Sequence, residues 1–121
     1  MNGRRAALVA LFVAACGPVL TGPPPSPPPR GAVIVAASIA FDRQELDVRA
    51  GGSFALLLQN RDAIPHNLTI VGPDGAPVFV GEIFSGPGSR AYEVPALAPG
   101  RYPFRCDVHP LSMIGEVVAA P

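Results

Sequence analysis

Short runs of alternating apolar and polar residues constrain the fold of this chain more than any other feature. Leu46 and Val48 stand between charged residues, and Tyr92 and Val94 stand on either side of a glutamate. Successive side chains of a β-strand point to opposite faces of a sheet, so this alternation indicates strands with one buried face. The 16 prolines and 13 glycines interrupt helices and favour turns. The chain is therefore predicted to be all-β.

Turn-forming sequences separate the alternating runs. They lie at residues 51–52, 72–75, 86–88 and 99–100, and all of them contain glycine. Residues 97–102 resemble the tyrosine corner of Greek-key sandwiches, in which a tyrosine hydroxyl bonds to nearby backbone. Together these signals predict a Greek-key antiparallel β-sandwich of about seven or eight strands.

The first 30 residues differ in composition from the rest. Arg4 and Arg5 precede an apolar run over residues 6–15 that is too short to span a bilayer. Small residues then precede Cys16, which resembles a bacterial lipoprotein signal. The resemblance implies cleavage before Cys16, lipid attachment to this residue, and an exported protein anchored at the cell envelope, on its periplasmic or extracytoplasmic face. An ordinary secretory signal with an incidental cysteine is the alternative.

Three regions follow from this reading. Residues 1–15 are predicted to be a signal peptide, and residues 16–30 a lipid-attachment cysteine followed by a linker. Seven prolines fall between residues 18 and 29, so the linker is expected to be an extended spacer of roughly 40 Å. Residues 31–121 are predicted to be the folded domain.

Charge excludes one class of partner. The chain carries 9 basic and 9 acidic residues, for a formal net charge of zero. Nucleic-acid binding calls for a basic face, which this composition does not indicate. We expect a monomer that does not bind nucleic acid.

Soft metal ligands cluster near the C-terminus. Cys106, His109 and Met113 lie within eight residues, and His66 is the only other histidine. Cys106 shares the parity of Tyr102, so its side chain is expected to point into the sandwich. A thiolate, two imidazoles and a thioether favour copper over hard ions. Zinc is the main competitor, although structural zinc sites usually carry more cysteines. A cysteine nucleophile is a weaker alternative, because no third orienting group is evident.

This segment resembles the C-terminal copper loop of the cupredoxins, and residues 65–67 resemble the upstream ligand sequence of the same family. The resemblance covers roughly residues 38–119 and is closest to the plastocyanin and amicyanin group. It implies one type 1 copper with His66, Cys106 and His109 as equatorial ligands and Met113 as the weak axial ligand. It also implies that Asn67 steadies the ligand loop. Three residues separate His109 from Met113, whereas amicyanins have two and plastocyanins four, so the axial contact can differ here.

The expected function is single-electron transfer between redox protein partners at the outside of a bacterial membrane. A lone type 1 site has no open substrate position, so the chain is expected not to be an enzyme. Two alternatives stay open at this point. The first is a copper carrier that delivers the metal by ligand exchange, and the second is a tethered interaction domain that binds no metal.

Overall fold

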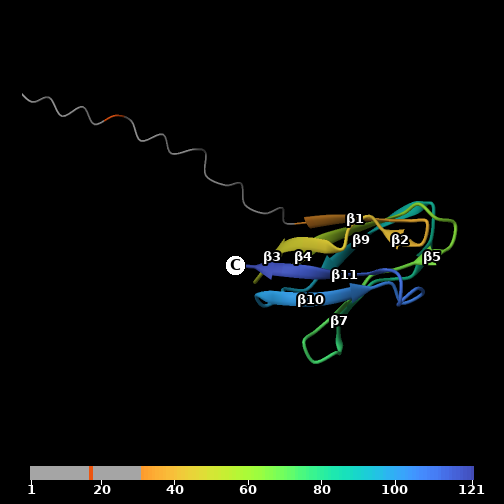
Figure 1. Cartoon of the computed structure of the whole chain (residues 1–121). Coiled ribbons are helices and arrows are strands. Elements are labelled where there is room, and N and C mark those ends of the chain that lie inside the picture. Colours follow the sequence, from red (N-terminus) through yellow and green to blue (C-terminus); the bar gives the residue numbers. More distant parts are fainter. Residues whose placement is uncertain (1–16, 18–30) are drawn as a thin grey trace, which may run out of the picture.

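The computed structural model describes Gly17 and residues 31–121 (Figure 1). The predicted signal peptide, Cys16 and nearly all of the linker lie outside the described residues. The described part contains eleven strands and no helix. They are β1 (Gly31–Ala37), β2 (Ala40–Phe41), β3 (Glu45–Arg49), β4 (Phe54–Asn60), β5 (Pro65–His66), β6 (Thr69–Val71), β7 (Pro77–Val80), β8 (Phe84–Ser85), β9 (Gly88–Val94), β10 (Gly100–Arg105) and β11 (Ile114–Ala120).

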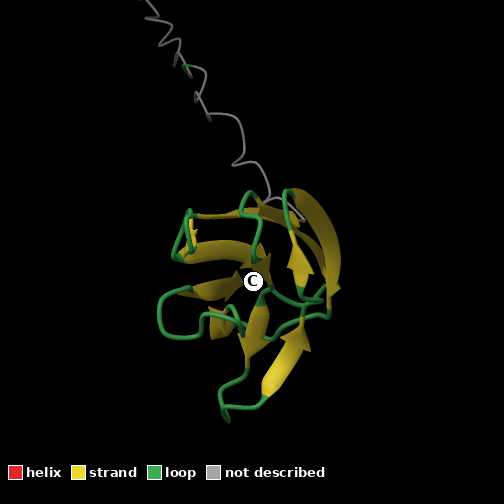
Figure 2. Ribbon diagram, turned by 90° about the vertical axis from the view of Figure 1, so that its right-hand side faces the viewer, coloured by secondary structure: helices red, strands yellow, loops and turns green. Residues whose placement is uncertain are grey.

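Two sheets form the body of the domain, which Figure 2 shows from the end that lies at the right of Figure 1. One sheet has the strand order β2-β1-β4-β9, and the other has the order β3-β11-β10-β6-β7. The short strands β5 and β8 pair with each other in a separate ribbon. The predicted all-β sandwich is confirmed. No helix in the described part is long and apolar enough to cross a membrane.

Strand direction differs from the purely antiparallel prediction. β1 runs parallel to β4, and β3 runs parallel to β11. β1 was not among the alternating runs because its sequence, Gly31–Ala37, contains no polar residue. Its burial still alternates in part, with Ile34 fully buried and Val33 44% exposed. The direction of pairing depends on contacts between distant strands, so the alternation of residues within one strand does not encode it.

The alternating residues fill the space between the sheets. Leu46 and Val48 of β3 are buried, as are Leu56 and Leu58 of β4. The predicted tyrosine corner is present, because the Tyr102 hydroxyl donates a hydrogen bond to the Ala98 carbonyl at 2.8 Å. This bond fixes the chain at the start of β10.

One end of the sandwich gathers the termini of several strands. β4 and β10 end there and β11 begins there, and the β5–β8 ribbon lies at the same end (Figure 1). The C-terminus lies at the opposite end. Residues that follow β4 and β10, far apart in sequence, are therefore brought together.

Candidate metal centre

His66 comes to the site on β5. This strand pairs with β8 through the register His66 to Phe84, and the His66 side chain is fully buried. The loop that leads into β5 is held by Asn60, whose Nδ2 donates to the carbonyls of Ile64 and Phe84 at 2.9 and 3.0 Å. His66 thus occupies a position set by side-chain hydrogen bonds as well as by packing.

Cys106 follows the last residue of β10 and is also fully buried. Its burial confirms the parity prediction, since Tyr102 and Phe104 are buried on the same face. Its amide donates to the Met113 carbonyl at 2.9 Å, which closes the loop between β10 and β11. Inside this loop the amides of His109 and Met113 complete two further backbone hydrogen bonds.

The three strongest predicted ligands converge. The donor atoms of His66, Cys106 and His109 all lie within 4.8 Å of one another. Cys106 Sγ is 3.8 Å from Nδ1 of His66 and 4.0 Å from Nδ1 of His109. A metal bonded at about 2.0 Å to nitrogen and about 2.3 Å to sulfur, at a trigonal angle, would separate the two donors by about 3.7 Å. The observed distances therefore fit one metal ion among these atoms.

Met113 lies at the end of the same loop. Its side chain is fully buried, and its main chain bonds to both Cys106 and His109. The thioether is thus held inside the ligand end of the domain, and its assignment as the axial ligand stays a prediction.

A polar network joins the two chain segments that carry His66 and Cys106. Asn67 Oδ1 accepts a hydrogen bond from the Asp107 amide at 2.8 Å, and Asn67 Nδ2 donates to the Asp107 carboxylate at 2.8 Å. The Thr69 hydroxyl donates to the same carboxylate at 2.6 Å. These bonds tie the residue after one ligand to the residue after the other, which is a geometry that supports the predicted steadying role of Asn67.

Sequence reasoning missed Asp107. Burial raises the pKa of this carboxyl, but hydrogen bonds from Asn67, Thr69 and Arg105 outweigh that effect and leave the pKa below its usual value. An acidic residue directly after the predicted thiolate ligand was the signal that could have identified it.

Asp62 was also missed. Its Oδ2 lies 2.8 Å from Nε2 of His66, on the opposite side of the imidazole from the thiol. Hydrogen bonds from the Ile39 amide, the His66 ring and the Ser38 amide lower the pKa of Asp62 to about 2. The carboxylate is therefore ionised at neutral pH. In the sequence, the one feature that pointed to its contact with His66 was its position four residues earlier.

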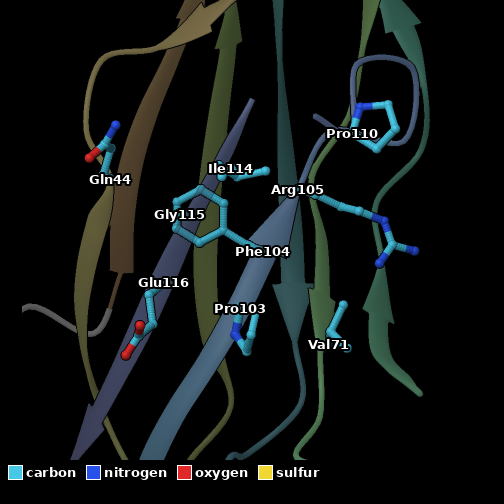
Figure 3. Close-up of a pocket in the computed structure, with 9 residues that line it drawn as sticks. All are labelled: Gln44, Val71, Pro103, Phe104, Arg105, Pro110, Ile114, Gly115 and Glu116. Atoms are coloured by element: carbon cyan, nitrogen blue, oxygen red, sulfur yellow. The ribbon is translucent and has the colours of Figure 1, made fainter. Parts of the chain in front are cut away.

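A groove beside the ligand loop is not the metal centre. It lies on the outer side of β10 and β11 and is lined by residues that include Pro103, Arg105, Pro110 and Ile114 (Figure 3). None of the four predicted ligands lines it. Of the three converging donors, those of His66 and Cys106 are buried and that of His109 is partly buried.

At one end of the β-sandwich a buried thiol lies between two imidazoles. This donor set is typical of proteins that bind a single soft metal ion. Comparison with known families identifies the class. Residues 6–119 match the family model described as a cupredoxin-like domain, so the chain belongs to the cupredoxin-like family. No curated protein matched the chain in the sequence comparison.

Solved structures agree with this assignment. Sodium dithionite-reduced auracyanin from Roseiflexus castenholzii is 22% identical, with a TM-score of 0.69, covering 78% of this chain and 100% of its own. Auracyanin A from Chloroflexus aurantiacus, a "blue" copper protein, is 22% identical with a TM-score of 0.66, covering 74% and 98%. A reduced mutant of amicyanin is 27% identical with a TM-score of 0.58, covering 73% and 80%. The family, the fold and the donor set are consistent with one type 1 copper.

Proposed function

We propose that this protein is a single-electron carrier with one type 1 copper, held by His66, Cys106 and His109 with Met113 as the weak axial ligand. The observation that carries the proposal is the convergence of the three donor atoms within 4.8 Å. Bound copper supplies a one-electron couple between Cu(II) and Cu(I). The chain supplies a fixed set of donors, since hydrogen bonds from Asn60, Asn67 and Tyr102 hold the segments that bear them.

Rigid donors suit electron transfer better than metal delivery. His66, Cys106 and Met113 are fully buried, so ligand exchange with an acceptor protein would require the ligand end of the domain to open. A donor set that keeps one geometry needs little rearrangement when the charge of the metal changes. Burial therefore favours an electron carrier over a copper carrier, and over an enzyme that needs an open coordination position.

His109 offers the shortest route to the surface. It is only partly buried, and its ring centroid lies 5.0 Å from that of His66. Exposed apolar residues flank it in the loop, with Val108 at 39% and Leu111 at 94% exposure. We propose that electrons enter and leave through His109, and that this apolar surface docks redox protein partners in brief encounters.

The predicted lipid anchor places this chemistry at a membrane. Acylated Cys16 would hold the protein at the outside of a bacterial membrane, and the proline-rich linker would keep the domain away from the lipid. The ligand end is opposite the C-terminus (Figure 1). We expect a monomer that exchanges electrons with redox protein partners.

The two cysteines provide a matched test of this proposal. Full-length protein loaded with Cu(II) is expected to be intensely blue, with the spin-resonance spectrum of a type 1 site. Cys106→Ala should abolish the colour, because it removes the thiolate donor. Cys16→Ala should keep the colour and release the protein from the membrane fraction.

Two outcomes would contradict the proposal. A colourless copper complex of the unsubstituted protein would exclude a type 1 site. A blue complex whose copper passes to a chelator within the mixing time would favour copper delivery over electron transfer.

A further inference from the structure

The Asp62 carboxylate makes three hydrogen bonds, which reach two separate parts of the structure. Its Oδ1 accepts from the Ser38 amide at 2.8 Å, and its Oδ2 accepts from the Ile39 amide at 3.0 Å and lies 2.8 Å from Nε2 of His66. The Asp62 side chain is only 19% exposed, and the His66 side chain is fully buried. Asp62 therefore links the β1–β2 turn to the imidazole of a predicted ligand.

The turn that presents these two amides is strained. Ser38 and Ile39 have φ values of 54° and 57°, in the left-handed region that glycine and asparagine prefer and that a β-branched residue rarely adopts. A two-residue hairpin turn of this kind usually contains Asn-Gly. Here both amides point to one carboxylate, so the hydrogen bonds to Asp62 help to stabilise an otherwise unfavourable turn.

The Asp62 backbone is fixed independently. Its amide donates to Asn60 Oδ1 at 2.9 Å, and the Arg61 amide donates to the Ala36 carbonyl at 2.9 Å. Gly86 packs so closely here that a Cβ on it would overlap the Asp62 carbonyl. These contacts hold the Asp62 backbone, and the carboxylate is held by the two turn amides beside Nε2 of His66.

We propose that Asp62 is a positioning residue with two effects. It holds the ring proton of His66 on Nε2, and its negative charge lowers the reduction potential of the copper site. This inference rests on the proposed function. A proton on Nε2 leaves the lone pair of Nδ1, the atom 3.8 Å from the thiol sulfur, free to bind a metal. An anion behind a ligand stabilises Cu(II) more than Cu(I), because the attraction grows with the charge of the metal.

The experiment compares Asp62→Asn with the matched variant Asp42→Asn. Asparagine has one acceptor oxygen where the carboxylate has two, so three donors can no longer all be satisfied. Asp42 is the appropriate control, because it also binds a backbone amide of the same hairpin, that of Val35 at 2.8 Å. Asp42→Asn thus removes the same charge from the same hairpin, keeps an acceptor for the Val35 amide, and affects no bond to His66.

Two readouts are expected to change only in Asp62→Asn. The first is the affinity for Cu(II), which should fall by about 10- to 100-fold. Each tenfold loss that is not matched by Cu(I) should raise the reduction potential by about 59 mV. The second is the nitrogen NMR spectrum of the metal-free protein, in which His66 should be protonated on Nε2 in the unsubstituted chain and should lose this preference in Asp62→Asn.

Three results would overturn or confine the inference. Equal potentials for Asp62→Asn and Asp42→Asn would refute the effect on copper. Protonation of His66 on Nδ1 in the unsubstituted, metal-free protein would refute the positioning role, and this measurement needs no variant that might fail to fold. An unsubstituted chain that binds no copper would overturn the proposed function and the effect on potential, while the NMR result would still decide the position of the proton.

Discussion

The two histidines of the candidate site belong to halves of the molecule that are built differently. His66 is carried by a strand and is enclosed by side chains, with Asp62 on its Nε2 and Asn60 holding the preceding loop. His109 is carried by the loop between β10 and β11, which is closed by backbone hydrogen bonds and is joined to Asn67 and Thr69 through Asp107. The His66 side chain is fully buried, whereas the His109 side chain is only partly buried. The first half is therefore expected to tolerate much less change than the second.

The largest difference between the two halves is expected in the rescue by imidazole after each histidine is removed. His109→Gly should leave a gap at the surface that imidazole from solution can fill, because His109 is only partly buried. His66→Gly should not be rescued, because His66 is fully buried and its loss leaves Asp62 without one hydrogen-bond donor. Titration of each copper-loaded variant with imidazole, followed by visible absorption, measures the difference. Equal rescue of both variants would show that the two halves are equally accessible.

A smaller difference, in the stability of the domain, is expected when either of two neighbouring glycines is replaced by alanine. Gly86→Ala places a methyl group against backbone of the loop that supports His66, at 2.5 Å from the Asn60 carbonyl oxygen. Overpacking of this kind typically costs about 1–3 kcal/mol. Gly88→Ala is the control, because a Cβ at that position meets no atom within 4 Å. Denaturant unfolding should show a lower stability for Gly86→Ala alone, and similar stabilities would argue against a tightly packed His66 half.

The smallest difference, in the rate of electron self-exchange, is expected from a charge at the exposed tip of the ligand loop. Leu111→Glu adds charge to the proposed docking surface, whereas Val78→Glu adds charge to β7, at a side chain that is 40% exposed. Electron self-exchange between oxidised and reduced protein requires two copies to meet, so like charges at the contact should slow it. NMR line broadening should show slower exchange for Leu111→Glu only, with an unchanged visible spectrum. Slower exchange for Val78→Glu alone would place the contact elsewhere.

The same contrast explains what could be predicted from the sequence. The alternation of Tyr102, Phe104 and Cys106 placed the thiol in the core, and the structure confirms it. The close spacing of Cys106 and His109 also predicted their proximity. Such features depend on residues within one strand or one loop, where geometry follows directly from sequence separation.

Features that join distant segments could not be predicted in the same way. The bonds from Ser38 and Ile39 to Asp62 span 24 and 23 residues and depend on an unusual backbone conformation. The parallel pairing of β1 with β4 likewise depends on the assembled sheet. The position of Asp107 directly after Cys106 was visible in the sequence, but its bonds to Asn67 and Thr69 span 40 and 38 residues and depend on the assembled sheet. Lipid attachment at Cys16 stays a prediction, because that residue lies outside the described part of the chain.

X-ray absorption of the copper-loaded, unsubstituted protein tests the central claim most directly. If His66, Cys106 and His109 hold one metal ion, the copper shell should contain two nitrogen donors and one sulfur donor at bonding distance. One copper should bind per chain. A shell made only of nitrogen and oxygen, with no sulfur at bonding distance, would contradict the account.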